Sequence, residues 1–300
     1  MHPTLIVGSV AFDTLHIGGT CHAKVLGGSA TYASIAATHF GAVQLVGVVG
    51  RDFPDTATRM LRERGVDLAG LEVTDGDTFH WEGRYSDDLS SRETLRTDLN
   101  VFADFRPKIP QSFRSTPFVM LGNIDPTLQM EVLDQIKAPK LVLADTMNLW
   151  IDIRRPELCE LCKRVDVLVL NDEEARQLTD QKNLVLAARA LHALGPKTVI
   201  IKKGEHGALL LQGGETFSLP ALPLSDVADP TGAGDTFAGA LIGFIARSGD
   251  VSSANLRRAV VYGSVLASFC VQGVSTSRIS SATAAEVSAR FEEFKRLTTF

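Results

Sequence analysis

Short apolar runs recur along this chain, and longer stretches with helical spacing of their apolar residues lie between many of them. The first run is Leu5-Ile6-Val7, which ends at Gly8. Later runs with the character of buried strands occupy residues 43–49, 118–121, 141–144, 165–170 and 198–201. The stretches typical of helices are 32–40, 55–64, 127–137, 184–194, 235–247, 255–271 and 284–297. Buried strands alternating with helices form parallel sheets covered on both faces. The pattern predicts an α/β fold, a three-layer α/β/α sandwich.

Residues 72–105 depart from this alternation. Aromatic and polar residues alternate there over short stretches rich in charge, which is typical of exposed antiparallel strands. We predict a β lid formed by 14–24 and 74–105, on a main domain formed by 1–13, 25–73 and 106–300. Phe79, Trp81 and Tyr85 would share one face of a strand. That face could stack on a substrate or contact a second copy of the chain in a homodimer.

The bulk composition favours a small-molecule partner. The chain has 30 basic and 35 acidic residues, a formal net charge of −5, and no long run of one sign. This balance predicts neither a nucleic-acid nor a membrane partner. Two of its 4 cysteines form a CELC stretch, but no further ligand pair suggests zinc, and a reducing cytoplasm is the expected compartment. No apolar run reaches the ~18 residues of a membrane span.

The stretch DPTGAGD, from Asp229 to Asp235, carries the most chemical information. A glycine-rich turn that opens a helix leaves backbone N–H groups unpaired, and with the helix dipole they bind anions. A carboxylate beside such a site is understandable if it accepts a proton from an attacking hydroxyl. The alternative from these residues alone is that Asp235 caps the helix. No GxxxxGK[ST] or early GxGxxG is present, so the Walker and Rossmann classes are not indicated.

DPTGAGDTFAGALIG resembles the C-terminal signature of the ribokinase (PfkB-type) family of carbohydrate and nucleoside kinases. Further stretches match that family in order over residues 5–280: Gly8-Ser9 with Asp13, Gly27-Gly28, Asn171-Asp172-Glu173-Glu174, and Gly204-Glu205-His206-Gly207. The resemblance implies a ribokinase-like fold and an ATP-dependent phosphotransferase that uses Mg²⁺.

The resemblance also implies roles for individual residues. Asp235 would be the catalytic base, and Gly232, Ala233 and Gly234 would supply the amides of an anion hole. Substrate would be bound by Asp13, Gly27, Gly28, Tyr32 and Trp81. The nucleotide would be bound by Asn171, Glu174, Lys202, Gly204 and Gly207, with Glu174 reaching Mg²⁺ through water. Asp229, with the region around Ser275, could hold a monovalent cation such as K⁺.

Two positions differ from the family pattern. Tyr32 stands near the place where the family commonly has a substrate-binding Asn, so the acceptor pocket must differ in shape. Lys202 and Lys203 stand where the family more often has an uncharged residue, and they either steer the triphosphate or are solvated. The leading interpretation is transfer of the ATP γ-phosphate to a primary hydroxyl of a small sugar. A nucleoside kinase acting on the ribose 5′-hydroxyl is the alternative, and a non-catalytic nucleotide or sugar sensor a remote one.

Overall fold

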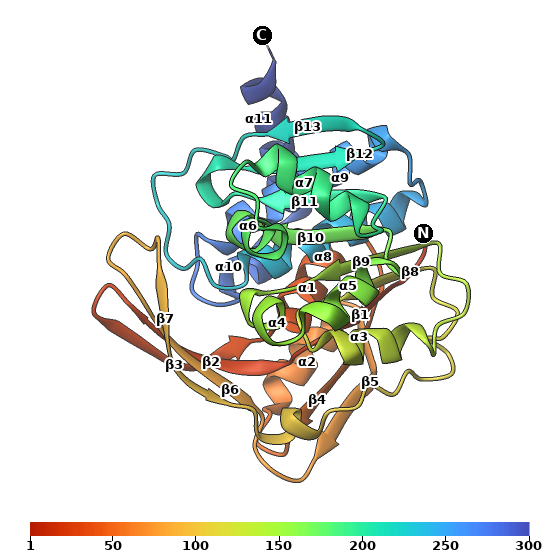
Figure 1. The fold of residues 1–300 in the computed structure, drawn as a ribbon. Coiled ribbons are helices and arrows are strands. Elements are labelled where there is room, and N and C mark those ends of the chain that lie inside the picture. Colours follow the sequence, from red (N-terminus) through yellow and green to blue (C-terminus); the bar gives the residue numbers. More distant parts are fainter. Residues whose placement is uncertain (300) are drawn as a thin grey trace.

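A computed structural model describes residues 1–299 of the chain, and its centre is one large mixed sheet (Figure 1). Seen from one edge to the other, this 9-stranded sheet of the described residues consists of β13 (Glu215–Leu219), β12 (Ala208–Gln212), β11 (Thr198–Lys202), β10 (Val167–Asn171), β9 (Leu141–Asp145), β8 (Phe118–Leu121), β1 (Thr4–Val7), β4 (Val43–Gly50) and β5 (Val66–Thr74). All neighbours from β11 to β5 run parallel, whereas β12 and β13 form an antiparallel edge. The carboxyl ends of the parallel strands therefore meet at one edge, where α/β sheets bind ligands.

Helices cover both faces of this sheet, and successive strand residues point to opposite faces. Ile6, Met120 and Val169 face one apolar cluster, while Leu5, Val119 and Leu168 face the other. The helices of the first face are α1 (Ser29–Thr38), α2 (Asp55–Glu63), α8 (Ala233–Ser248), α9 (Ser253–Cys270), α10 (Ser277–Ser281) and α11 (Ala284–Thr298). Those of the second face are α3 (Pro126–Leu133), α4 (Asn148–Ile153), α5 (Arg155–Cys162), α6 (Asp172–Thr179) and α7 (Leu184–Ala193). The predicted three-layer sandwich is confirmed.

Helix α8 lies in the middle of the first face and packs closely on α1. A Cβ atom on Gly239 would overlap the backbone of Ala33, and one on Gly243 would lie 2.9 Å from the Cα atom of Ala37. Small residues at these contacts let the two helix backbones approach. This packing places the start of α8 against Tyr32 of α1.

A second sheet of four strands projects from the main body, at the lower left of Figure 1. Its order is β3 (Thr20–Gly27), β2 (Ala11–Ile17), β6 (Phe79–Tyr85) and β7 (Arg92–Asp98). The short helix η1 (Asn100–Asp104) leads from β7 back to the main body. The strands β2 and β3 extend beyond the 14–24 segment expected from the sequence. Where the lid ends as a separate unit stays a prediction.

Most expected elements agree with the structure to within a few residues. Helix α1 starts earlier than the predicted 32–40, because Gly28, with φ 93°, ends the preceding strand and lets the chain turn directly into the helix. The sequence pattern predicted no helix at α4 or α10, which have 6 and 5 residues.

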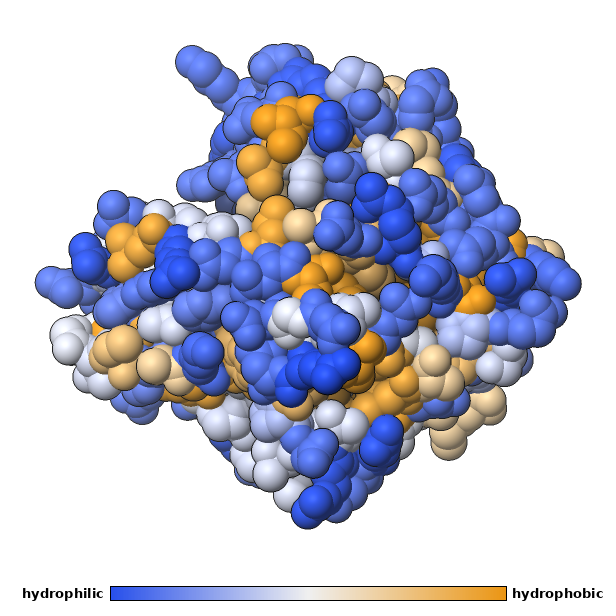
Figure 2. Space-filling model, turned by 90° about the horizontal axis from the view of Figure 1, so that it is seen from below, coloured by the Kyte–Doolittle hydropathy of each residue, from blue (hydrophilic) through white to orange (hydrophobic). Residues whose placement is uncertain are grey.

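The surface view in Figure 2 shows mostly hydrophilic residues on the face seen there, with hydrophobic residues in small groups. Among the described residues, no helix has both the length and the apolar character required to cross a membrane.

Candidate active site

The DPTGAGD stretch forms a tight loop that opens α8. Gly232 is the N-cap residue in the left-handed conformation, with φ 73°, and no side chain caps the helix. The Ala233 amide donates to the Pro230 carbonyl at 3.3 Å. Within residues 1–299, the amides of Gly232 and Gly234 have no acceptor. The loop therefore offers two free N–H groups at the positive end of a 16-residue helix, which together can bind an anion.

Asp229 holds this loop in place. Its carboxylate is fully buried and accepts hydrogen bonds from the amides of Thr231 at 2.8 Å and Ser275 at 2.9 Å. The Cys270 thiol donates to the Thr231 carbonyl at 3.4 Å. Two chain segments 46 residues apart are thus fixed to each other directly behind the anion-binding amides.

Asp235 lies in the first turn of α8, beside those amides. Burial, reinforced by the nearby Asp145 carboxylate and opposed by Lys202 and Arg92, raises the pKa of Asp235 to about 7. A carboxyl group that changes charge near neutral pH is suited to accept a proton and to release it again.

Lys202 lies directly under the same loop. Its side chain is 17% exposed, and its Nζ atom lies 3.2 and 3.3 Å from the two carboxylate oxygens of Asp145. A Cβ atom on Gly234 would lie 2.8 Å from that Nζ. The solvated alternative is therefore wrong for Lys202, because β11 ends inside the site and carries the ammonium group to the anion-binding loop.

Asp145 was not identified from the sequence. It is 3% exposed, ends β9 and accepts a hydrogen bond from the Thr146 amide at 3.0 Å. The signal that could have revealed it is its position, because a polar residue directly after the apolar run 141–144 marks the carboxyl end of a central strand.

Asn171 and Glu174 form a reciprocal cap at the start of α6. The Asn171 side chain accepts from the Glu174 amide at 2.8 Å, and the Glu174 carboxylate accepts from the Asn171 amide at 2.7 Å. Burial, opposed by Lys202, raises the pKa of Glu174 to about 7. The cap fixes Glu174 at the end of β10 through one carboxylate oxygen, so the other carboxylate oxygen is available to a ligand.

The residues present fit a magnesium ion held mainly by a ligand. No cluster of three or more potential metal-binding side chains occurs among residues 1–299. Mg²⁺ commonly binds through one or two carboxylates together with substrate phosphates and water. The buried Glu174 carboxylate at the carboxyl edge suits that arrangement.

Asp13, the carboxylate expected from the resemblance to bind the acceptor, lies in β2 (Ala11–Ile17). It is 5% exposed, and no described residue donates a hydrogen bond to its side chain. A Cβ atom on Gly27 would overlap its carboxylate, so the glycine makes room for it. Burial first, then repulsion from Asp229 and Asp235, raises the pKa of Asp13 to about 8. A buried carboxyl group without a partner is costly unless a ligand supplies hydrogen bonds.

The aromatic residues predicted to share a face have separate contacts. Phe79 stacks on Phe102, with ring centroids 5.3 Å apart, and the Tyr85 hydroxyl lies 2.9 Å from that of Thr231 in the anion-binding loop. Trp81 pairs with Asp13 across β2 and β6 and stays partly exposed.

Tyr32 does not line an open pocket in this structure. Its side chain is 1% exposed, and its ring lies against Gly232. It supports the anion-binding loop from below.

The predicted nucleotide hairpin joins β11 to β12 through the short helix η2 (Gly204–His206). A Cβ atom on Gly207, where φ is 87°, would overlap the backbone of Leu219, so only glycine fits there. Lys203 donates its amide to the Gly207 carbonyl at 2.7 Å. The hairpin follows directly on Lys202, whose ammonium group lies against the anion-binding loop.

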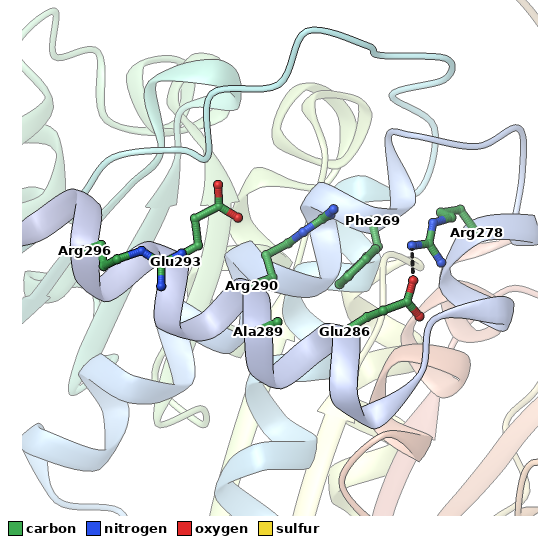
Figure 3. A pocket seen from close by; sticks show the side chains of 7 residues that line it. All are labelled: Phe269, Arg278, Glu286, Ala289, Arg290, Glu293 and Arg296. Carbon is green, nitrogen blue, oxygen red and sulfur yellow. Dashed lines mark hydrogen bonds and ion pairs between the residues drawn. The ribbon is translucent and has the colours of Figure 1, made fainter.

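A separate hollow near the C-terminus contains none of these residues. Figure 3 shows it between the end of α9, α10 and α11, lined by Phe269, Arg278, Glu286, Ala289, Arg290, Glu293 and Arg296. Two of its arginines already have partners: Arg278 binds Glu286 at 2.7 Å, and Arg290 lies 3.5 Å from the centre of the Phe269 ring. These contacts hold α11 against the main body.

Comparison with known proteins points to one family. A family model described as pfkB family carbohydrate kinase matches residues 4–283. A cytidine kinase of Thermococcus kodakarensis is 31% identical over 247 residues, covering 81% of this chain and 87% of that protein. The fold is shared with a solved structure of a putative ribokinase II from E. coli in complex with ATP and Mg²⁺, with a TM-score of 0.81 and 18% identity over 98% of this chain and 100% of that one. It is also shared with a nucleoside kinase of Methanocaldococcus jannaschii, with a TM-score of 0.76 and 19% identity over 98% of this chain and 99% of that one. The fold class and the resemblance expected from the sequence are confirmed.

Proposed function

This chain belongs to the PfkB family of carbohydrate kinases and is an ATP-dependent sugar or nucleoside kinase; we propose that its acceptor is a nucleoside, phosphorylated on the 5′-hydroxyl of the ribose. The observation that carries the proposal is the direct pairing of Asp13 with Trp81 across β2 and β6. The carboxylate is suited to bind ribose hydroxyls, and the indole ring beside it is suited to stack on a flat base. The likeness to a cytidine kinase along most of the chain supports the same class of acceptor.

The charges of the site favour a neutral acceptor. Asp13, Asp145, Glu174 and Asp235 contribute four carboxyl groups, and Lys202 is the buried cation among them. An acceptor with its own phosphate or carboxylate would add negative charge where repulsion between carboxyl groups already raises the pKa of Asp13. A nucleoside or a free sugar would add none.

The proposed reaction uses the groups in sequence. Asp235 accepts the proton of the 5′-hydroxyl while that oxygen forms a bond to the γ-phosphorus. The bond from the γ-phosphorus to the bridging β,γ-oxygen breaks, and ADP leaves with that oxygen. The amides of Gly232 and Gly234, with the Lys202 ammonium, stabilise the negative charge on the transferring group. Asp235 then releases its proton to solvent.

Magnesium would supply charge neutralisation at the triphosphate, and Glu174 would hold it through water. The nucleotide would extend from the anion-binding loop toward the hairpin of Gly204 and Gly207. A monovalent cation such as K⁺ beside Asp229 is also proposed, because each oxygen of this fixed carboxylate accepts one amide and keeps a further lone pair. Activity in potassium compared with activity in a large organic cation tests that site.

A reducing cytoplasm and a homodimer complete the proposal. All four cysteines are free thiols. The small sheet projects from the main body and is the proposed contact between two copies. Light scattering of the purified protein tests the homodimer.

ADP release measured with Mg·ATP tests the acceptor. The panel contains cytidine, uridine, adenosine and inosine, with ribose and fructose as acceptors that lack a base. We expect higher kcat/KM for at least one nucleoside than for either sugar. Trp81→Ala should raise KM for that nucleoside and leave the weaker reaction with ribose unchanged. Preference for a free sugar, or an equal effect of Trp81→Ala on both acceptors, would contradict the nucleoside assignment.

A further inference from the structure

Arg92 stands at the start of β7, directly opposite Tyr85 on β6. Residues paired across adjacent strands point to the same face of a sheet. Arg92 therefore shares its face with Tyr85, with Trp81 and, through the β2–β6 pairing, with Asp13. Its guanidinium carbon lies 5.6 Å from the centre of the Trp81 ring.

This face of the small sheet is turned toward the catalytic centre. The Tyr85 hydroxyl, next to Arg92, lies 2.9 Å from the Thr231 hydroxyl in the anion-binding loop. The charge of Arg92 also reaches three carboxyl groups of the site: it opposes the burial that raises the pKa of Asp13, of Glu174 and of Asp235. Arg92 therefore stands on the face that carries Asp13, beside the tyrosine that contacts the anion-binding loop.

Arg92 has no ion-pair partner among residues 1–299, unlike other arginines of this sheet. Arg84 pairs with Glu93 at 3.8 Å, and Arg96 pairs with Asp98 at 2.7 Å. A cation that faces a site and lacks a protein anion is available to bind an anionic ligand there.

We propose that Arg92 is a catalytic residue whose guanidinium binds the transferring phosphoryl group from the side opposite the amides of Gly232 and Gly234. The inference rests on the proposed kinase reaction and adds a residue to it. The planar guanidinium can donate two parallel hydrogen bonds to phosphoryl oxygens, and it stays protonated throughout. The bonds formed and broken are those given above, and the proton still goes to Asp235. Arg92 contributes charge from the small sheet at the moment when charge spreads over the transferring oxygens.

Steady-state kinetics of Arg92→Met test the proposal, with Arg84→Met as the matched control from the opposite face of the same sheet. Loss of one such donor typically lowers kcat by about 10²–10³-fold. We expect that loss for Arg92→Met, with KM for the nucleoside changed by no more than about threefold, and little change for Arg84→Met. Added guanidinium ion should restore part of the activity of Arg92→Ala, which a merely structural role would not explain. A kcat within about twofold of wild type, or an effect on KM alone, would overturn the assignment.

The design separates failure of this inference from failure of the proposed function. If the wild type phosphorylates a nucleoside and Asp235→Asn does not, normal kcat in Arg92→Met refutes the role of Arg92 alone. If no acceptor of the panel reacts, the proposed acceptor is wrong. The rate of ATP hydrolysis without an acceptor is then compared between the wild type and Arg92→Met. Water then receives the same phosphoryl group, so unchanged hydrolysis in Arg92→Met also refutes the inference. The thermal midpoint checks folding, and little change is expected because Arg92 is exposed.

Discussion

Replacing Gly232 by alanine should destabilise the protein far more than the same change at the other end of the same helix. Gly232 and Gly249 cap the two ends of α8, and both are left-handed, with φ 73° and 68°. The conformation alone costs a non-glycine residue about 1–2 kcal/mol. At Gly249 the new Cβ would meet only the His2 ring, at 3.4 Å, which is ordinary contact. At Gly232 it would overlap the ring of Tyr32, which is 1% exposed and cannot move aside freely.

Overpacking of this kind costs roughly 1–3 kcal/mol, so Gly232→Ala should lose about 2–5 kcal/mol and Gly249→Ala about 1–2 kcal/mol. Urea unfolding followed by circular dichroism gives both values, provided that the slope with denaturant is unchanged. Adding Tyr32→Leu to Gly232→Ala should remove the overlap, so the double variant should lose less than the sum of the single losses. Equal losses at the two glycines, or strict additivity with Tyr32→Leu, would show that the ring does not support the loop as described.

Three further predictions concern the chemistry. Asp235→Asn should lower kcat by about 10²–10⁴-fold while nucleotide binding persists. Because the base must be ionised and the pKa of Asp235 is about 7, wild-type kcat should fall as the pH drops through 7. The pH profile of the variant should lack this decrease. Lys202→Met leaves the Asp145 carboxylate buried without its cation. The variant should therefore have a higher KM for ATP and a free energy of unfolding lower by about 3–5 kcal/mol. Adding Asp145→Asn to this variant should recover part of that stability in urea unfolding. Glu174→Gln should keep the cap on Asn171, and therefore the thermal midpoint, yet raise the Mg²⁺ concentration needed for half-maximal activity; an unchanged magnesium requirement would remove Glu174 from the metal site.

The layered fold could be predicted because periodicity reports burial directly. Runs such as 118–121 are apolar at every position, since these strands are buried on both faces. The order of strands in the sheet could not be read in this way. In the sheet, β1 lies between β4 and β8, but neither of these strands follows β1 directly in the sequence. Tertiary packing decides that order. Short helices such as α4 lack enough residues for a periodic signal.

The site residues also fall into two groups, those that the local sequence indicates and those whose position depends on tertiary packing. Asp235 and the glycines before it stand in one continuous stretch, so the sequence could single them out, and the family resemblance decided between a catalytic role and a helix cap for Asp235. Tyr32 could be placed near substrate by position in the chain, but its burial under Gly232 depends on how α1 packs against α8. Arg92 carries no local signal at all, because it is one of several charged residues in an exposed hairpin, and only the register of β6 with β7 selects its face.

The ion pair of Lys202 and Asp145 explains how a buried ammonium group stays charged beneath the anion-binding loop. Burial alone would lower the pKa of Lys202, but the Asp145 carboxylate first, and then Glu174 and Asp235, reverse the effect and hold the pKa above its usual value. The ammonium group therefore stays charged before the nucleotide arrives. A phosphate on the amides of Gly232 and Gly234 would approach the same ammonium group, since Gly234 lies directly against it. The site thus provides positive charge at the loop without having to create it on binding.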